Sequence, residues 1–231
     1  MRNIYLVGHM ASGKTTVGQL LAETLNLNFV DTDCNVERLY GKSINQIFKK
    51  EGELQFRIFE TAVLLQTTLV DNTIVSTGGG ILKRMRNGVY MKDFGFVIYL
   101  ELSVEEQAKR LLADSQLSKR PIVKDCKDSK ELFEKLNDLH EKRNVTYEYF
   151  ADYIIDVNKA SPAEIVQRII DFLNQNKLIG DLDFLDSFAG RMQYNPYKRL
   201  RRNENLERIR GKVEPKKRSS KRKEYVQLDN E

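Results

Sequence analysis

The sequence has 231 residues with a formal net charge of +5, and its 41% hydrophobic and 31% charged residues are typical of globular proteins. No apolar run approaches the ~20 residues of a membrane-spanning helix, and the two cysteines form neither a metal-ligand spacing nor a disulfide framework. We therefore exclude integral membrane proteins and disulfide-stapled secreted domains, and because a strand begins at residue 4, leaving no room for a signal peptide, we expect a cytoplasmic protein.

The first expected element is a short apolar strand over residues 4–7, and a glycine-containing loop follows it directly. Residues 8–15, GHMASGKT, match the phosphate-binding pattern G-x-x-x-x-G-K-[ST], and residues 16–25 have the apolar spacing of a helix. Glycines let consecutive N–H groups turn inward around an anion, and the helix directs the positive end of its dipole at the same anion. Lys14 is then expected to reach the β- and γ-phosphates, and Thr15 to ligate Mg²⁺. The sequence predicts a nucleotide-binding site.

Strands and helices alternate along the next 150 residues. Further strands are expected at residues 28–31, 73–76, 96–100 and 153–156. Helices are expected at residues 34–39, 44–48, 52–70, 129–149 and 162–174, with one more beginning after Ser103. The helix at 52–70 is expected to bury Phe56, Phe59, Val63, Leu64 and Leu69. Five β/α alternations with short connections predict an α/β fold, with a parallel sheet and helices on both faces.

Two carboxylates follow the second expected strand. Asp31 lies at its carboxyl end, where ligands gather in parallel sheets, and could hold Mg²⁺ through water beside Thr15. Asp33 lies just past the strand end and could face the hydroxyl of an acceptor. The alternative for Asp33 is the N-cap of the following helix, because aspartate is a preferred capping residue.

Arg57 and Glu60 lie three residues apart on one face of the helix at 52–70. They form either a surface ion pair of little energetic value, or a pair in which Glu60 orients Arg57 to bind a substrate carboxylate through two hydrogen bonds. The glycines at 78–80 follow a strand, where they either make a flexible turn or bring backbone N–H groups close to a bound molecule.

Three further arginines are candidates for binding an anion. Arg120 precedes a proline within residues 114–128, which lack a long apolar face and are expected to form a mobile loop. A cation carried by a lid can stabilise the charge of a transferring phosphoryl group and exclude water. Arg110 and Arg143 lie on the helices before and after this loop, and each of the three, taken singly, also fits a solvated surface position.

Taken together, these motifs resemble those of the shikimate kinase family, in the family's order and near its spacings over residues 1–175. The matching positions are Gly8 to Thr16, Asp31 to Asp33, Gly52, Glu53, Phe56, Arg57, Glu60, Thr77 to Gly80, Lys119 to Pro121, Arg143, Tyr147, Ala151 and Asp152. The resemblance implies a P-loop fold similar to that of nucleoside monophosphate kinases. It further implies a five-stranded parallel sheet, a helical substrate-binding segment at about 33–60 and a mobile lid at about 112–124.

The resemblance also implies an activity and a set of site residues. The activity is ATP-dependent phosphorylation of shikimate to 3-phosphoshikimate, in chorismate and aromatic amino acid biosynthesis, with Mg²⁺ as cofactor. On the nucleotide side it implies Ala11, Ser12, Gly13, Lys14, Thr15 and Thr16, with Arg120 on the lid, Arg110 near adenine, and Thr15 and Asp31 for the metal. On the acceptor side it implies Asp33, Arg57, Gly79 and Arg143, and the implied catalytic residues are Lys14, Asp33 and Arg120.

Some positions depart from the family's pattern. The segment between Arg110 and Arg120 is a few residues longer than expected, and only Lys159 stands where some relatives carry an adenine-contacting arginine. His9 and Met10 are variable positions of the phosphate-binding loop, and we assign no role to them. The departures leave the adenine contact open and do not affect the expected chemistry.

Two other functions stay open. A different small-molecule kinase of the same fold, such as a gluconate kinase, would also need a carboxylate clamp, although the combination of Asp31, Asp33, Arg57 and three glycines favours shikimate. A nucleic-acid-binding protein that uses the nucleotide as a switch is the second alternative, and its support comes from the C-terminal extension.

The net positive charge of the chain comes from the extension, residues 176–231. Residues 198–224 hold 13 Lys and Arg against 4 Asp and Glu, a net charge of +9, whereas residues 1–197 have a net charge of −2. Basic runs interleaved with tyrosines could make weak contact with a nucleic acid or another polyanion, and the alternative is a solvated tail that is largely disordered from about 195. We expect a monomer that binds ATP and shikimate and no membrane.

Overall fold

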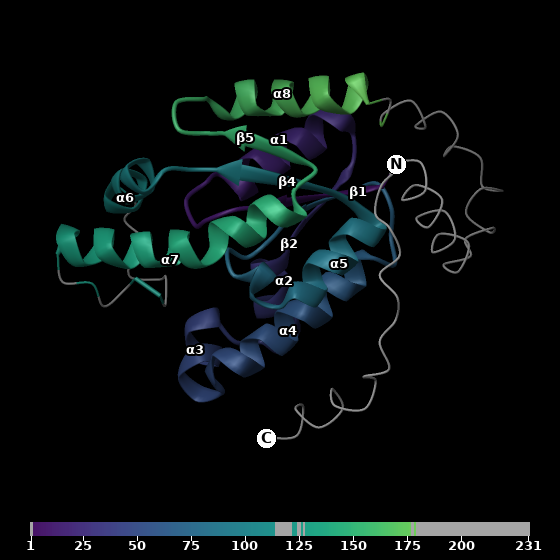
Figure 1. Ribbon diagram of the computed structural model, residues 1–231. Helices are drawn as coiled ribbons and strands as arrows, with labels where there is room; N and C mark the ends of the chain where they lie inside the picture. The colour runs from purple at the N-terminus through teal and green to yellow at the C-terminus, as the bar shows by residue number, and fades with distance from the viewer. Residues whose placement is uncertain (1, 114–121, 124–125, 127, 177, 179–231) are drawn as a thin grey trace, which may run out of the picture. The chain divides into compact units, whose positions relative to one another are not determined.

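The computed structural model describes residues 2–113, 122–123, 126, 128–176 and 178, all within the first compact unit of the chain, residues 1–192 (Figure 1). The strands are β1 (Asn3–Val7), β2 (Asn28–Asp31), β3 (Thr73–Ser76), β4 (Gly95–Glu101) and β5 (Tyr153–Asp156). The helices of the described residues are α1 (Lys14–Leu25), α2 (Thr32–Tyr40), α3 (Ile44–Lys50), α4 (Gly52–Thr67), α5 (Met85–Phe94), α6 (Val104–Ala113), α7 (Ser129–Phe150), α8 (Pro162–Gln175) and the 3₁₀ helix η1 (Ile81–Lys83). The expected alternation of strands and helices is confirmed.

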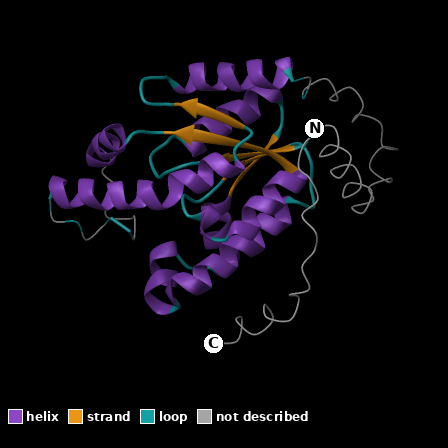
Figure 2. Cartoon of the chain, viewed as in Figure 1, coloured by secondary structure: helices purple, strands orange, loops and turns teal. Residues whose placement is uncertain are grey.

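The strands form one parallel sheet in the order β2-β3-β1-β4-β5, with β1 at the centre. Figure 2 shows the strands enclosed between helices. Ile4 of β1 is the register partner of Ile74 in β3 and of Phe96 in β4. Because parallel strands need crossover connections, a helix separates each strand from the next. The order places the carboxyl ends of β2, β3 and β1 side by side, so the loops that follow these three strands meet at one edge of the sheet.

Helices cover both faces of the sheet, as predicted. Alternate residues of β1 point to opposite faces, since side chains of a strand alternate. Ile4 and Leu6 pack in a core with residues of α1 and α8, whereas Tyr5 and Val7 pack in a second core with residues of α4, α5 and α7. Figure 1 shows α8 on one side of the sheet and α4, α5 and α7 on the other. All four side chains are fully buried, so burial of apolar surface holds both layers to the sheet.

Helices α2, α3 and α4 pack around a small core of their own. Val36, Ile47 and Phe56 meet in it, one from each helix. Ser43 caps α3 with a complete capping box, as its position before the helix predicts. These helices occupy the segment expected to bind substrate, and that role stays a prediction.

Two stretches differ from expectation. Leu69 was expected to be buried but is 82% exposed, because α4 ends at Thr67 and the residue lies beyond it. No element was expected over residues 81–94, where the structure has η1 and α5. Helix α5 buries Asn87, Gly88 and Met91, a set without apolar periodicity, and a Cβ on Gly88 would lie 2.5 Å from the Phe150 ring. The helix is therefore specified by tertiary packing, which local pattern does not reveal.

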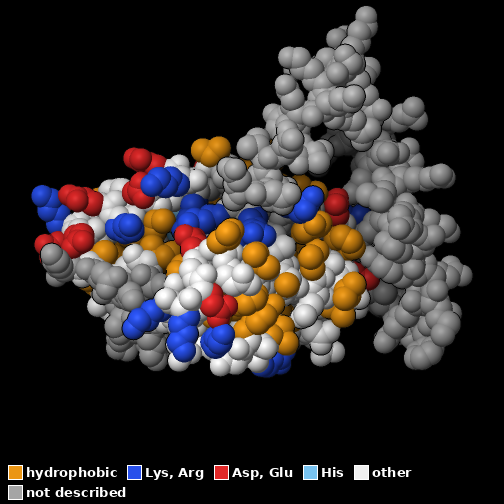
Figure 3. All heavy atoms as spheres, turned by 90° about the horizontal axis from the view of Figure 1, so that it is seen from below, with side chains coloured by type: hydrophobic (Ala, Val, Ile, Leu, Met, Phe, Trp, Pro, Cys, Tyr) orange, Lys and Arg blue, Asp and Glu red, His pale blue; other side chains and the backbone are white. Residues whose placement is uncertain are grey.

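Some apolar side chains lie on the surface. The exposed ones on α4 and α5 and the turn after α4 are Leu54, Ile58, Leu65, Leu69, Val70, Met85 and Val89. Figure 3, viewed from below Figure 1, shows hydrophobic side chains spread over this face among basic ones. Within the described residues, no helix has the length and apolar character needed to cross a membrane.

Candidate active site

The loop between β1 and α1 forms the anion-binding end of the site. Gly13 precedes α1 with a left-handed φ of 89°, and in the described part of the chain no side chain caps this N-terminus. The first N–H groups of α1 and the positive end of its dipole are therefore available to a phosphate. Lys14 is 8% exposed and donates hydrogen bonds to the carbonyls of Gly8 and His9, over 2.9 and 2.7 Å. This arrangement fits the predicted phosphate-binding role.

Ala11 has a strained backbone within this loop. Its φ of 63° lies in the left-handed region, which costs an L-residue about 1–2 kcal/mol because Cβ crowds the following carbonyl oxygen. The carbonyl of Ala11 accepts a hydrogen bond from Arg110 Nη1 over 3.3 Å, so the strained peptide is held from the side of α6.

Replacing Ala11 by glycine should raise the free energy of unfolding, by about 0.5–1 kcal/mol once the larger entropy loss of glycine on folding is included. Denaturant unfolding followed by circular dichroism measures the change. Ala163→Gly, at an exposed position in the first turn of α8, is the control and should lower the free energy of unfolding. A lower stability for Ala11→Gly would show that the loop does not store this strain.

Three oxygen atoms meet beside the start of α1. The Thr15 hydroxyl donates to Asp31 Oδ2 over 2.8 Å and lies 3.3 Å from Ser76 Oγ. Asp31 and Ser76 end β2 and β3 and are register partners in the sheet. The structure thus brings together Thr15 and Asp31, the two predicted metal ligands. Ser76 was missed, and its place at the carboxyl end of an expected strand is the feature that could have revealed it.

Asp33 is not the N-cap of α2. That role belongs to Asp31, whose Oδ1 accepts hydrogen bonds from the N–H groups of Asp33 and Cys34 over 3.0 and 3.2 Å. The alternative that made Asp33 the cap is therefore wrong. Asp33 Oδ1 is buried and has no hydrogen-bond partner among the described residues, so this carboxylate can accept a hydrogen bond from a ligand.

Arg57 and Glu60 form a buried ion pair. Arg57 Nη1 lies 2.7 Å from Glu60 Oε2, and the two side chains are 7% and 0% exposed, so the alternative of a surface pair is wrong. At the other edge of the guanidinium, Nε and Nη2 donate to Glu53 Oε1 over 3.2 and 3.0 Å. Two carboxylates therefore fix the orientation of Arg57.

The glycines at 78–80 let the backbone approach these charged side chains. A Cβ on Gly78 would lie 2.6 Å from Asp33 Oδ1 and 2.6 Å from Glu60 Oε1. A Cβ on Gly80 would lie 2.6 Å from Arg57 Cζ. Real Cβ atoms do not come this close to other atoms, so a side chain at either position would displace the charged groups of the site. The turn is thus part of the site.

Helix α7 contributes a second arginine. Arg143 is 6% exposed, and its Nη1 donates to the carbonyl of Gly79 over 2.8 Å, while the Tyr147 hydroxyl donates to the same carbonyl. Its Nε and Nη2 are buried and lack a hydrogen-bond partner among the described residues. A buried guanidinium with unused donors is costly unless an anion satisfies them. Arg143 is thus poised to bind an anionic ligand.

The electrostatics of the site raise two carboxyl pKa values. Burial raises the pKa of Asp33 to about 6, and the negative charge of Asp31 adds to the shift. The cations Lys14 and Arg57 oppose it. Burial raises the pKa of Glu60 to about 7 against the opposing charge of Arg57. Acidic groups that titrate near neutral pH beside buried cations are typical of functional sites.

Arg110 lies between the phosphate-binding loop and the loop after β5. Besides its bond to Ala11, its Nη2 donates to the carbonyl of Val157 over 2.7 Å and its Nε to Glu106 Oε1 over 3.0 Å. This position agrees with an expected contact on the nucleotide side, which stays a prediction. Arg120 and most of the expected lid lie outside the described residues.

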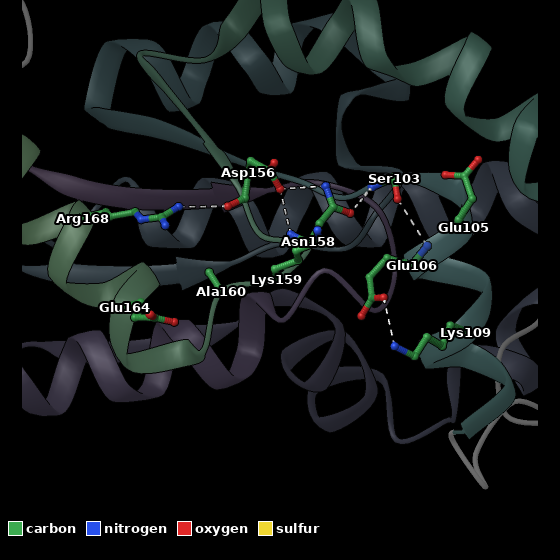
Figure 4. Close-up of a pocket in the computed structure, with 10 residues that line it drawn as sticks. All are labelled: Ser103, Glu105, Glu106, Lys109, Asp156, Asn158, Lys159, Ala160, Glu164 and Arg168. Carbon is green, nitrogen blue, oxygen red and sulfur yellow. Dashed lines mark hydrogen bonds and ion pairs between the residues drawn. The ribbon is translucent and has the colours of Figure 1, made fainter.

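A cavity of about 610 Å³ lies between α6, the loop after β5 and α8 (Figure 4). Acidic and basic side chains line it together: Ser103, Glu105, Glu106, Lys109, Asp156, Asn158, Lys159, Ala160, Glu164 and Arg168. Glu106 and the Asn158 carbonyl also bond to Arg110, whereas none of the residues expected to bind the acceptor lines this cavity. The cavity therefore adjoins the nucleotide end of the site, and Lys159 faces it.

Several known proteins with similar sequences and folds are shikimate kinases. The family model described as shikimate kinase matches residues 10–174. A shikimate kinase of Haemophilus influenzae (strain PittEE) is 38% identical over 182 residues, which cover 78% of this chain and 98% of the relative. A shikimate kinase of Acinetobacter baumannii (strain AYE) is 40% identical over 176 residues, which cover 76% of this chain and 94% of the relative. Among solved structures, shikimate kinase from Acinetobacter baumannii in complex with shikimate is 38% identical with a TM-score of 0.71, covering 77% of this chain and 96% of that one. The structure of shikimate kinase from Aquifex aeolicus is 36% identical with a TM-score of 0.59, and the match covers 76% of this chain and 98% of that one.

Proposed function

This chain belongs to the shikimate kinase family, and from that premise we propose that its site transfers the γ-phosphoryl group of ATP to the 3-hydroxyl of shikimate. ATP-dependent phosphorylation of shikimate, in aromatic amino acid biosynthesis, is its function. In the proposed step a bond forms between the shikimate oxygen and phosphorus, the bond from phosphorus to the β–γ bridging oxygen breaks, and ADP leaves. The hydroxyl proton passes to the protein or to solvent.

A single observation supports the acceptor half of this proposal. Two buried donors of the site, Arg143 Nε and Nη2, and one buried acceptor, Asp33 Oδ1, have no hydrogen-bond partner among the described residues. The donors complement a carboxylate and the acceptor complements a hydroxyl. Shikimate carries both groups, so one hydroxylated carboxylic acid satisfies both sets of atoms.

Each acceptor-side residue then has a proposed role. Arg57 and Arg143 bind the shikimate carboxylate, with Glu60 holding Arg57 in place. Asp33 binds the ring hydroxyls and accepts or orients the proton of the attacking one. Gly79 contacts the substrate through its backbone. These residues mainly position the acceptor in line with the phosphoryl donor, which is the principal demand of phosphoryl transfer.

The nucleotide-side residues bind and neutralise the phosphates. Lys14 places its ammonium against the β- and γ-phosphates, and the proposed lid residue Arg120 adds a second cation as it closes. Arg110 lies on the adenine side. The loop residues proposed to surround the phosphates are Ala11, Ser12, Gly13, Lys14, Thr15 and Thr16. Fixed cations of this kind stabilise negative charge as it develops.

Thr15 and Asp31 would hold Mg²⁺, since their oxygens lie 2.8 Å apart at the end of the phosphate-binding loop. Hydroxyl and carboxylate oxygens are suitable ligands, and Mg²⁺ usually completes its shell with phosphate oxygens and water. When bound, the ion neutralises charge on the phosphates of ATP. Asp31 can serve here with one carboxylate oxygen while the other caps α2.

A coupled assay of ADP release tests the function. ATP turnover by the purified full chain should depend on shikimate, and gluconate at equal concentration should support less than a tenth of that rate. Mass spectrometry of the product should show one added phosphoryl group. Equal rates with the two acids, or ATP hydrolysis that ignores shikimate, would contradict the proposal.

We expect kcat/KM for shikimate to fall below about pH 6, because the free enzyme then carries a proton on Asp33, which can no longer accept one from the hydroxyl. Stability should change in the opposite sense. The pKa of Asp33 is about 6 in the folded chain and about 4, its ordinary value, in the unfolded chain. Its contribution to the free energy of unfolding is therefore greatest below pH 4 and falls as the pH rises from about 4 to 6. Relative to wild type, Asp33→Asn should gain stability over that interval. A flat kcat/KM profile down to pH 5 would contradict the expectation.

The remaining proposals concern the catalytic domain as a unit and the C-terminal extension. We propose that residues 1–175 are a self-sufficient catalytic domain that acts as a monomer in the cytoplasm, and that the basic tail at most binds polyanions weakly. Truncation after residue 176 should leave kcat and both KM values within twofold and should abolish any retention on heparin at low salt. Loss of activity on truncation would show that the extension belongs to the catalytic unit.

A further inference from the structure

The chain contains two histidines, and the structure stacks one on the other. His9 comes from the phosphate-binding loop after β1 and His140 from the middle of α7. Their ring centroids lie 3.7 Å apart with an interplanar angle of 2°, and the residues are 1% and 7% exposed. Nothing in the local sequence around either residue predicts this contact. A parallel, buried stack is a specific packing arrangement that fixes two elements against each other.

The hydrogen bonds of His140 identify its protonated nitrogen. Gln107 Nε2 donates to the carbonyl of Met10 over 3.0 Å, which turns Gln107 Oε1 toward His140 Nε2 at 2.7 Å. An amide oxygen can only accept, so His140 Nε2 carries the hydrogen. The same glutamine thus joins α6, α7 and the phosphate-binding loop.

The hydrogen bonds of His9 lead to the same tautomer. Asn144 Oδ1 accepts from the Tyr99 hydroxyl over 3.3 Å and lies 2.7 Å from His9 Nε2. His9 Nε2 is therefore the donor, and Nδ1 bears a lone pair. Among the described residues Nδ1 has no hydrogen-bond partner, so a proton there would be a buried charge without an acceptor.

Burial and the charges around the stack favour the neutral form of both rings. Burial lowers the pKa of His9 to about 3, and the nearby cations Lys14 and Arg143 contribute to the shift, while the hydrogen bond to α7 opposes it. Burial also lowers the pKa of His140, which Glu105 opposes and Arg143 assists. Two neutral rings can stack face to face, whereas a protonated pair would repel.

The stack connects the two halves of the site. The carbonyl of His9 accepts a hydrogen bond from Lys14 over 2.7 Å, and Arg143 lies one helical turn beyond His140, where it bonds to Gly79. We propose that the His9–His140 stack is a positioning contact that sets the distance between the phosphate-binding loop and α7, and hence between the phosphoryl donor and the acceptor carboxylate. The inference rests on the proposed roles of Lys14 and Arg143. A displacement of about 1 Å between reacting groups can lower a rate about 10²-fold.

Kinetics of three variants test the positioning role. His140→Ala removes the stack and should lower kcat at least tenfold, while KM for ATP stays within twofold because α1 and its loop remain intact. His140→Phe keeps a flat ring against His9 and should retain kcat within about threefold of wild type. Glu141→Ala, the exposed neighbour on α7, is the matched control and should leave kcat unchanged. Melting temperatures of all variants separate loss of fold from loss of positioning.

Coupling between the two rings gives a sharper criterion. If they act through their mutual contact, His9→Ala/His140→Ala should be no slower than the slower single variant. The proposal is overturned if His140→Ala keeps kcat within twofold, if phenylalanine rescues no better than alanine, or if the two single effects multiply in the double variant.

The stack itself can be observed without any turnover. In the untagged chain labelled with ¹⁵N-histidine, long-range ¹H–¹⁵N correlation should show two Nε2–H tautomers, and each ring should become protonated only below the ordinary histidine pKa. In His140→Ala the His9 ring should lose this protection and change its resonances. A ring that titrates near the ordinary pKa of about 6.5 overturns the stacked geometry. Absence of shikimate-dependent turnover in the wild type, with normal histidine spectra, would instead contradict the proposed function and with it the positioning role.

Discussion

Asp33→Asn should lower kcat for shikimate phosphorylation by about 10²–10⁴-fold, the range that a positioned acid or base contributes. Asparagine keeps the shape of the side chain but cannot take up a proton. Affinity for ATP should stay within threefold, since the phosphate-binding loop and α1 do not depend on this carboxylate. Initial-rate kinetics with a coupled ADP assay and calorimetric titration with ATP in the absence of shikimate measure the two effects.

Stability provides an internal control for this variant. Because burial makes the ionised form of Asp33 unfavourable, Asp33→Asn should be at least as stable as wild type at pH 8, so lost turnover cannot be attributed to unfolding. Glu37→Gln is the matched control. This substitution removes a negative charge that raises the pKa of Asp33. The amide oxygen of the new glutamine can still accept the hydrogen bond from the Ile44 N–H, so kcat should stay within threefold of wild type. An Asp33→Asn enzyme with kcat within tenfold of wild type would remove Asp33 from the mechanism.

Local sequence patterns predicted most elements of the fold and their layering, but not the order of the strands in the sheet. The phosphate-binding loop, the capped helices and the short apolar strands each carry their information in a few adjacent residues. Helix α5 lacks such a local signal, because its buried positions include Asn87 and Gly88. Gly88 is buried because the ring of Phe150 packs against it. The strand order, which brings the ends of β1, β2 and β3 together, depends on long-range packing that no window of sequence contains.

The candidate site shows the same division between local and long-range information. Residue types at known spacings indicated Asp31, Asp33 and Arg57, but burial decided between alternatives that the spacing left open. An i, i+3 arginine–glutamate pair is compatible with a surface or a buried position, and the 0% exposure of Glu60 settles it. The contact between His9 and the α7 amide joins positions 135 residues apart in sequence, so only the folded chain reveals it.

Arg57→Ala should impair both substrate binding and stability, because this guanidinium forms a buried ion pair with Glu60 and is proposed to bind the shikimate carboxylate. Loss of a charge-assisted contact with the shikimate carboxylate should raise KM for shikimate about 10- to 100-fold. Removal of the cation also leaves the buried Glu60 carboxylate without its partner at 2.7 Å, which should lower the free energy of unfolding by about 3–5 kcal/mol at pH 8. The destabilisation should shrink toward pH 6, since the pKa of Glu60, already raised to about 7 by burial, rises further without Arg57 and the neutral acid costs less to bury.

A second substitution separates the two effects of losing Arg57. In Arg57→Ala/Glu60→Gln the buried group is neutral at every pH, so most of the lost stability and its pH dependence should disappear. KM for shikimate should remain as high as in the single variant, because restoring the packing of α4 does not replace the missing cation. Denaturant unfolding at pH 6 and 8 and shikimate saturation curves for the two variants make the comparison. If KM recovers together with stability, Arg57 supports the site only through the fold of α4, and the carboxylate is bound by Arg143 without it.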